Sequence, residues 1–328
     1  MSALLDITNE KTGAAAKPTF SVIVPCWNAA RTLEATLASL AAQTRDDFEA
    51  ILVNDGSTDA TAEILARWAA SDERFRVFNL ANGGPSVARN FAAFQCARAD
   101  LLAFLDADDL WAPNKLERVA EFLAARPDVD AVYARIAFFR GEPETARTTS
   151  KIVSHPLTPA DLLKENRVCT MSNLVTRADL YRASGGLNPA IVHGEDLEWL
   201  VGVTAQGALI EGQDEVLVYY RASDDGLSGD LLRMHEGWSR AVATAEQSGF
   251  TLDAAELRAA EAVHLRYLAR RALRVRVPRF TALRLAWRGA SRSPRGFFGE
   301  PWRGGMTFLG ACLEPLMPYA LRRLAFSL

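Results

Sequence analysis

The chain has 328 residues, which is enough for one large domain with an appendage or for two domains. Its four cysteines are far apart and form no Cys-x-x-Cys pair, which argues against a disulfide framework or a zinc site and favours a reducing compartment. The net charge of −3 hides an asymmetry, because 13 Arg and 2 Glu give residues 263–328 a net charge of +11 and leave −14 on the rest.

The first third of the sequence alternates between short apolar runs and amphipathic stretches. After a loose leader at 1–17, the pattern predicts buried strands at 20–24, 49–53, 75–78 and 101–105, with helices at 30–43, up to about 68, and at 86–98. Strands that alternate with helices indicate βαβ units with right-handed crossovers. The predicted fold class is therefore α/β, with a mostly parallel central sheet flanked by helices.

The pattern loosens after Pro113. It predicts helices at 115–125, 159–165 and 193–205, strands at 130–139 and 214–220, an extended segment at 171–176 and a polar loop at 141–150. Beyond Ser223 it predicts helices at 230–247, 254–275 and 280–290, followed by a stretch with no clear period. We expect a leader at 1–17, an α/β domain at 18–225 with halves 18–112 and 113–225, and a basic, mainly helical region at 226–328.

Three carboxylates, Asp106, Asp108 and Asp109, directly follow the strand at 101–105. They would emerge at the carboxyl edge of the sheet, where open α/β sheets bind ligands. Oxygen ligands of this kind suit Mg²⁺ or Mn²⁺, which usually arrive bridged to phosphates. The alternative is a solvated acidic loop that also caps the following helix.

Two further strand ends carry candidate binding residues. Asp55 could accept a hydrogen bond from the imide N–H of a uracil ring, or it could simply close an Asx-turn in Asn-Asp-Gly. The Gly83-Gly84 pair lets the backbone approach a ligand, and Arg89 lies one turn into the next helix, suited to a diphosphate or, alternatively, to the surface. No Gly-x-Gly-x-x-Gly follows the first strand, so a dinucleotide site is not favoured.

Five motifs together resemble one family. In order they are Val24-Pro-Cys-Trp-Asn28, Val53-Asn-Asp-Gly-Ser-Thr-Asp59, Asn82-Gly-Gly-Pro-Ser-Val-Ala-Arg-Asn90, Asp106-Ala-Asp108 and Gly194-Glu-Asp196. This order resembles that of family 2 glycosyltransferases of the GT-A fold, over about residues 18–225. The signature Gln-x-x-Arg-Trp of processive synthases is absent, so the chain is more similar to non-processive members that add one sugar.

The resemblance implies a role for each matching residue. Binding of the nucleotide would involve Pro25, Trp27, Asn28, Asp55, Gly84, Arg89, Asp106 and Ala107. Asp108 would hold a divalent cation, Mn²⁺ or Mg²⁺, on the diphosphate, and Asp196 would be the general base for a single displacement with inversion. Possible acceptor or loop contacts are Glu195, His193, Arg221 and Ser228.

Three of these residues have alternatives without a functional role. Glu195 and Asp196 could be acids favourably placed at a helix N-terminus, and His193 could be a structural or exposed imidazole.

The arginine-rich end predicts an anionic partner surface. Arg266, Arg270, Arg271, Arg274 and Arg276 crowd one predicted helix, and aromatic residues such as Trp287 and Trp302 are interleaved with later arginines. This combination is typical of interfacial membrane binding, while a solvated helical face and homo-oligomerisation remain open and nucleic acid is not expected. With no secretory signal and no apolar run of roughly 18 residues, we expect a cytoplasmic protein, peripheral at the inner face of the membrane.

Three functions are compatible with these features. The first is a metal-dependent inverting glycosyltransferase. It would transfer a sugar from a nucleotide-sugar donor to a glycan or lipid-linked acceptor during synthesis of a surface polysaccharide. The second is a sugar-phosphate nucleotidyltransferase, although such enzymes carry a Gly-rich basic signature after the first strand that Pro25-Cys-Trp-Asn28 does not supply. The third is a non-catalytic sugar-nucleotide-binding or membrane scaffold protein.

Overall fold

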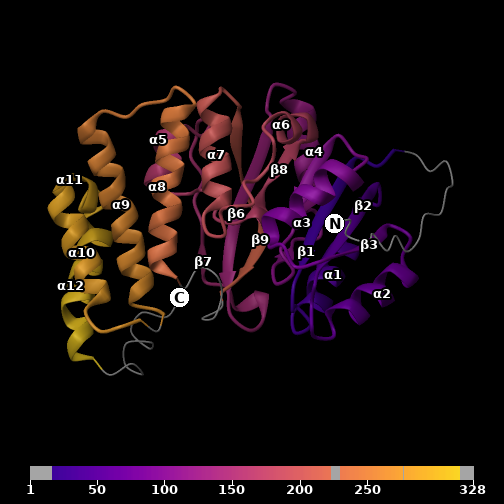
Figure 1. The fold of residues 1–328 in the computed structure, drawn as a ribbon, viewed down its shortest axis with the longest axis horizontal. Helices are drawn as coiled ribbons and strands as arrows, with labels where there is room; N and C mark the ends of the chain where they lie inside the picture. The colour runs from indigo at the N-terminus through magenta and orange to yellow at the C-terminus, as the bar shows by residue number, and fades with distance from the viewer. Residues whose placement is uncertain (1–16, 223–229, 276, 318–328) are drawn as a thin grey trace. The chain divides into compact units, whose positions relative to one another are not determined.

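The structure is a computed structural model, which describes residues 17–222, 230–275 and 277–317. Contacts divide the described residues into two units, whose helices and strands are labelled in Figure 1. The first unit comprises residues up to 157, 168–196 and 207–222, and the second comprises 158–167, 197–206 and the C-terminal helices. The domain boundaries expected from the sequence stay a prediction.

A nine-stranded sheet forms the centre of the first unit, in the order β3-β2-β1-β4-β8-β6-β9-β5, with β7 paired to β6. The strands are β1 (Phe20–Cys26), β2 (Phe48–Asp55), β3 (Phe75–Leu80), β4 (Leu101–Phe104), β5 (Leu110–Trp111), β6 (Ala131–Phe139), β7 (Thr148–Thr149), β8 (Val175–Arg177) and β9 (Ile210–Arg221). Strands β3, β2, β1 and β4 run parallel, whereas β8 is antiparallel to both β4 and β6. The predicted α/β class is confirmed.

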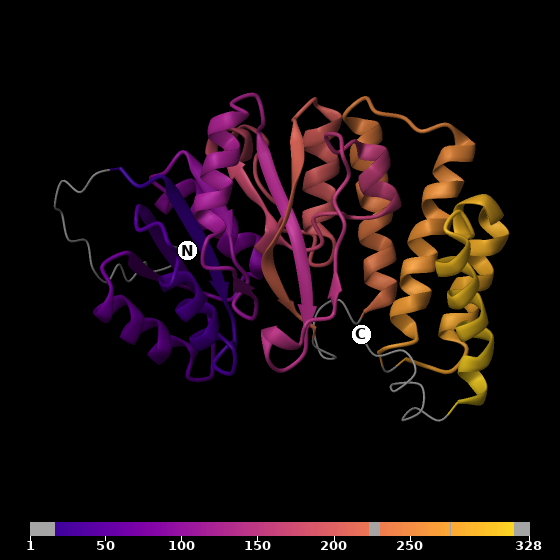
Figure 2. The ribbon, with the colours of Figure 1, turned by 180° about the vertical axis from the view of Figure 1, so that it is seen from behind.

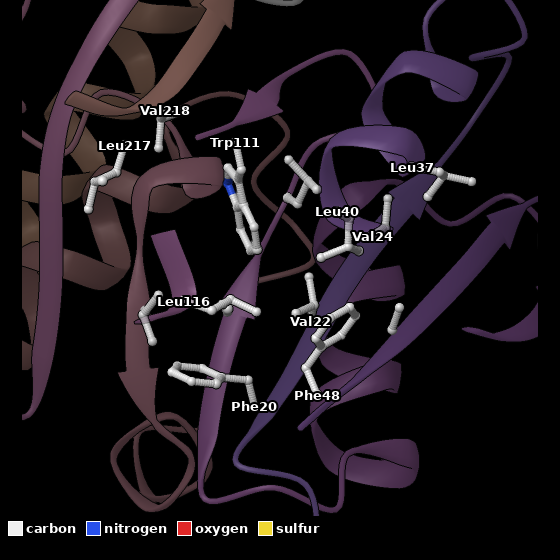
Figure 3. Close-up of a cluster of buried hydrophobic side chains, with 14 of the residues drawn as sticks. Phe20, Val22, Val24, Leu37, Leu40, Phe48, Trp111, Leu116, Leu217 and Val218 are labelled. Atoms are coloured by element: carbon white, nitrogen blue, oxygen red, sulfur yellow. The ribbon is translucent and has the colours of Figure 1, made fainter. Parts of the chain in front are cut away.

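One face of the sheet carries the main apolar core. Helices α1 (Leu33–Ala41), α2 (Thr61–Ser71) and α4 (Lys115–Ala125) contribute to the same buried cluster as alternate residues of β1 and β2. Figure 3 shows Phe20, Val22 and Val24 directed toward this cluster. On the other face, Phe104 of β4 contacts Tyr181 of α6 (Ala178–Ala183), with ring centroids 5.3 Å apart. Successive side chains of a strand point to opposite faces, so the central strands contribute apolar residues to a core on each face of the sheet.

Three stretches differ from the sequence-based expectation. The helix expected at 86–98 is α3 (Pro85–Phe91), which continues as a π-helix from Ala92 to Cys96. The segment expected to be extended begins with a 3-10 turn, Met171–Asn173, before β8. The polar loop at 141–150 includes β7, whose pairing with β6 gives its backbone hydrogen-bond partners that the polar sequence did not suggest.

A buried lysine lies at the start of α4. The Lys115 side chain is fully buried, and its Nζ lies 5.0 Å from the centroid of the Trp111 ring. Within the described residues, this Nζ has no hydrogen-bond partner. Burial lowers the pKa of Lys115 to about 7, because the charged ammonium loses its hydration.

We expect Lys115→Met to raise the free energy of unfolding by about 2–3 kcal/mol at pH 7. The folded-state pKa lies below the unfolded value of 10.5. The native protein therefore gains stability as pH rises from about 7 toward 10.5, and the cost of the charge is largest below that window. Urea unfolding at several pH values checks this: the advantage of the variant should shrink toward pH 10. An advantage that is absent at pH 7 or independent of pH would contradict it.

The second unit is helical. Its helices are α5 (Pro159–Lys164), most of α7 (Glu195–Ala205), α8 (Leu231–Gln247), α9 (Ala254–Ala272), α10 (Thr281–Arg292), α11 (Pro294–Phe297) and α12 (Pro301–Leu313). In both ribbon views α10, α11 and α12 pack beside α9 (Figure 2). Their shared core includes Leu265, Leu268 and Phe297. Helix α12 lies where the sequence showed no clear period.

In the part of the chain that the structure describes, no helix is both long enough and apolar enough to cross a membrane.

Candidate functional site

The carboxyl ends of β1, β2 and β4 lie at one edge of the sheet, because the three strands are parallel neighbours. Asn28 follows β1, Asp55 ends β2 and Asp106 follows β4. The predicted convergence of these strand ends is therefore present in the fold, at the edge where α/β sheets bind ligands.

Asp55 holds the glycine turn before α3. Its Oδ1 accepts a 2.8 Å hydrogen bond from the backbone N–H of Gly83, and its Oδ2 accepts one of 2.8 Å from that of Gly84. The carboxylate is only 2% exposed. Gly84 has a φ of 86°, a backbone region that favours glycine. The role of Asp55 in reading a base stays a prediction, and it would have to use the remaining lone pairs of oxygens that already hold the turn.

The segment after β1 is fixed to the segment after β2. Asn28 adopts a φ of 47°, and its side-chain oxygen accepts a 2.8 Å hydrogen bond from the N–H of Thr58. Its own N–H donates to Ser57 Oγ. These bonds fix the chain directly after Trp27. Two residues before Trp27, Pro25 of β1 pairs with Val53 of β2. The Trp27 indole is 59% exposed, so a large aromatic face is available at this edge.

Arg89 joins two acidic positions that are distant in sequence. Its Nη2 lies 2.5 Å from Asp106 Oδ1, and its Nη1 lies 3.2 Å from Glu195 Oε1. The guanidinium is almost completely buried. Burial alone would lower the pKa of Arg89, but the two carboxylates outweigh burial and keep this pKa above its ordinary value. Arg89 is thus a charged link between the end of β4 and the start of α7.

Asp108 and Asp109 occupy different environments. Burial, and then the neighbouring Asp106 charge, raise the pKa of Asp108 to about 6. Asp109 is almost fully buried; its Oδ2 accepts a 2.6 Å hydrogen bond from Ser172 Oγ, and burial followed by repulsion from Asp108 raises its pKa well above the usual value. Just before them, the carbonyl of Ala107 accepts a 2.9 Å hydrogen bond from the Thr32 hydroxyl. Asp109 therefore anchors the loop.

Arg221, at the end of β9, is brought to the same loop. Its backbone N–H donates to Asp109 Oδ1 at 3.0 Å, and its Nε donates to the carbonyl of Asp108 at 2.9 Å. The guanidinium also lies 4.6 Å from the centroid of the Phe139 ring. Ser228 lies outside the described residues.

The first two residues of α7 are the acids Glu195 and Asp196. Burial, and then the adjacent Asp196 charge, raise the pKa of Glu195 to about 7, although Arg89 opposes this shift. His193 is half-buried two residues before the helix. The catalytic and acceptor roles expected for these residues stay predictions.

Two hydroxyl residues complete the loop and were missed by the sequence reasoning. Thr170 Oγ1 donates to Asp106 Oδ2 at 3.0 Å, and Ser172 Oγ accepts a 3.0 Å hydrogen bond from the Asp106 N–H while donating to Asp109. Both residues precede β8, which reaches this position only because it pairs antiparallel to β4. No local signal in the sequence marks them.

The chemistry of the donor set fits a hard divalent cation. Within the described residues, no group of three or more His, Cys, Asp or Glu side chains is arranged to hold an ion unaided. Asp106 and Asp108 nevertheless bring two carboxylates close together in sequence and space. Burial, and then the Asp106 charge, raise the pKa of Asp108, and a bound cation would favour its charged form. A cation held by one or two carboxylates and completed by substrate phosphates is the usual arrangement for Mg²⁺.

Comparison with known proteins agrees with this fold. Residues 21–185 match the profile of the family described as Glycosyl transferase family 2. The putative teichuronic acid biosynthesis glycosyltransferase TuaG of Bacillus subtilis is 32% identical over 220 residues, covering 65% of this chain and 83% of TuaG. An uncharacterized glycosyltransferase of Nostoc, alr2836, is 32% identical over 215 residues, covering 61% of this chain and 64% of its own.

Solved structures share the fold at lower sequence identity. Staphylococcus aureus TarS in complex with UDP-GlcNAc has a TM-score of 0.59 and 19% identity, covering 94% of this chain and 89% of its own. The mannosyltransferase PcManGT of Pyrobaculum calidifontis, in complex with GDP-Man and Mn²⁺, has a TM-score of 0.58 and 20% identity, covering 99% and 87%.

The fold and the family match define a glycosyltransferase of the GT-A type. The chain belongs to glycosyl transferase family 2. The resemblance found in the sequence is confirmed.

Proposed function

We propose that this chain transfers one sugar from a nucleoside-diphosphate sugar, most simply a UDP-sugar, to a hydroxyl of a glycan or lipid-linked acceptor during synthesis of a cell-surface polysaccharide. The transfer is metal-dependent and inverts the anomeric carbon. The observation that carries the proposal is the Arg89 link, because one buried guanidinium binds both Asp106 and Glu195. It ties the donor-side carboxylates to the helix that bears the proposed base.

The printed descriptions of related proteins support the choice of substrates. TuaG is named for teichuronic acid biosynthesis, TarS was solved with UDP-GlcNAc, and PcManGT was solved with GDP-Man and Mn²⁺. Each names a nucleotide sugar or a surface polymer, so a donor of this class is the first to test.

The donor side is assigned to the strand ends. Asp108, supported by Asp106, would hold the cation, and the bound cation would neutralise charge on the departing diphosphate. Trp27 offers an exposed aromatic face for the nucleotide, and Asn28 and Asp55 fix the loops on either side of it. Pro25, Gly84, Ala107 and Arg89 shape the remainder of the proposed nucleotide site.

The acceptor side is assigned to the start of α7. The Asp196 carboxylate would take the proton of the acceptor hydroxyl while its oxygen bonds to the anomeric carbon. The bond from that carbon to the diphosphate breaks on the opposite side, and a nucleoside diphosphate leaves. A single displacement needs one base, so Glu195 is free to serve as the partner of Arg89.

A nucleotide-sugar panel tests this proposal. We expect a UDP-sugar with Mn²⁺ to raise the melting temperature, and we expect release of nucleoside diphosphate with an acceptor to fall at least about tenfold after chelation. Nuclear magnetic resonance of the product should show the inverted anomer. Chelator-insensitive transfer, or a retained anomer, would refute the mechanism. Release of diphosphate from a nucleoside triphosphate would instead indicate a nucleotidyltransferase.

A further inference from the structure

Most large apolar side chains of helix α12 are exposed, whereas its fully buried positions are small; Phe308 is the exception, half-buried against Phe297. The buried positions are small: Gly304, Thr307, Gly310 and Ala311. The exposed positions are large and apolar: Trp302 (79%), Met306 (46%), Leu309 (53%) and Leu313 (39%). The latter recur at i, i+4, i+7 and i+11, so they share one side of the helix, here called the α12 apolar face. Leu316, just beyond the helix, is 80% exposed.

The inward side of α12 is closely packed and cannot simply turn around. A Cβ on Gly304 would lie 2.6 Å from the backbone oxygen of Phe297, so only glycine fits there. Thr307 is buried and its hydroxyl donates to the carbonyl of Arg303 at 2.6 Å. The outward direction of the α12 apolar face is therefore fixed by packing.

In residues 277–317 both acidic residues have partners, and so does Glu261 of α9, the helix that packs against α10. Glu261 pairs with Arg288 at 3.1 Å and Arg292 at 2.6 Å, and Glu300 pairs with Arg266 at 2.7 Å. Glu314 is buried and accepts a 3.0 Å hydrogen bond from the N–H of Phe280.

Within residues 277–317 the charge that has no ion-pair partner is positive. The exposed arginines of this stretch for which no ion pair is found are Arg279, Arg284 and Arg295. Helix α10, which carries Arg284 and the exposed Trp287, contacts α12 and contains no acidic residue. The α12 apolar face therefore lies in a region whose free charges are cationic.

We infer that the α12 apolar face inserts into the interface of a bilayer that contains anionic lipids. Apolar residues would enter the boundary between headgroups and acyl chains, Trp302 would lie at headgroup depth, and the unpaired arginines would contact lipid phosphates. A second copy of the chain fits less well, because a two-fold contact across this face would bring cationic regions together. The inference goes beyond the proposed transfer reaction and does not depend on it.

This surface differs in part from the one that the sequence suggested: Trp302 and the later arginines belong to both, but the helix at 254–275 does not. The arginines of the predicted helix at 254–275 were expected to meet the membrane, but Arg266 is buried. Its Nη1 donates a 3.0 Å hydrogen bond to the carbonyl of Phe297, and its Nη2 pairs with Glu300. Arg266 therefore stabilises the helical core, and the exposed apolar residues belong to α12.

Vesicle co-sedimentation of the full chain tests the inference. We expect at least about tenfold tighter binding to phosphatidylcholine vesicles that contain phosphatidylglycerol than to phosphatidylcholine alone, weakening as salt rises. Leu309→Asp should lower this binding at least about tenfold, because it places a charge in the inserted face. Leu232→Asp is the matched control, since Leu232 is 70% exposed on α8 and should leave binding unchanged. Because both side chains are exposed, thermal melting should confirm that each variant folds.

A second measurement locates the inserted residue. Brominated lipids should quench tryptophan fluorescence of the native chain, and Trp302→Phe should remove most of this quenching. Failure of the native chain to bind anionic vesicles, or unchanged binding by Leu309→Asp, would overturn the inference. It would also be overturned if the chain elutes as a dimer that Leu309→Asp dissociates, with no vesicle binding, because a second copy would then cover the face.

Discussion

Replacing Asp196 by Asn is expected to lower the rate of sugar transfer by about 10²–10⁴-fold, with little effect on donor binding. The amide keeps the shape of the side chain but cannot take the proton of the acceptor hydroxyl. Asp196 lies beside Glu195 at the start of α7, so the change leaves the Arg89 link in place. Initial rates with donor and acceptor in excess, together with calorimetric titration of the donor, measure the two effects separately.

Glu198→Gln is the matched control for this change. Glu198 lies on the same helix, and its Oε1 accepts a 2.9 Å hydrogen bond from Thr244 rather than contacting the acidic edge of the sheet. The Glu198→Gln variant should retain most of the sugar-transfer activity. Near-native transfer by the Asp196 variant would remove the general base from the proposed mechanism and leave the family membership intact.

Arg89→Met is expected to destabilise the protein by about 3–5 kcal/mol. The change leaves Asp106 and Glu195 without the buried guanidinium that lies within hydrogen-bonding reach of both. Transfer should also be lost, because the positions of the β4 end and the α7 start are no longer joined. Urea unfolding measures the first effect, and the slope of the transition shows whether unfolding remains two-state.

Two comparisons separate this link from an ordinary ion pair. Arg67→Met removes a pair with Glu34 in which both side chains are about 60% exposed, and it should cost less than about 1 kcal/mol. Adding Glu195→Gln to Arg89→Met should recover part of the lost stability, since one uncompensated carboxylate is removed. Equal costs for Arg67→Met and Arg89→Met would show that the buried link is not the stabilising contact described above.

The sequence was sufficient for the parallel half of the sheet. Strands β1, β2 and β4 are buried on both faces, so each appears as a continuous apolar run whatever the rest of the fold does. The polar residues that follow these runs, Asn28, Asp55 and Asp106, could therefore be assigned to one edge before any coordinates. Their position depends only on strand direction and order.

The partners of those residues could not be predicted in the same way. Arg89 meets Glu195 across 106 positions of sequence, and Thr170 meets Asp106 across 64. These contacts arise because β8 pairs antiparallel to β4 and α7 begins beside α3, which local periodicity does not encode. The glycine turn held by Asp55 is a similar case, since an Asx-turn and a base contact have the same sequence signature.

Helix α12 shows where hydrophobic patterning fails. Its fully buried residues are Gly, Thr and Ala, and apart from Phe308 its large apolar residues are exposed. A search for a helix with a large apolar face directed at a core therefore does not find α12. By itself, the sequence determined the α/β class, the family and the acidic edge of the sheet, because each depends on short segments. Only the tertiary structure decided which charges are paired and which apolar side chains stay exposed, because pairing and burial depend on neighbours that are distant along the chain.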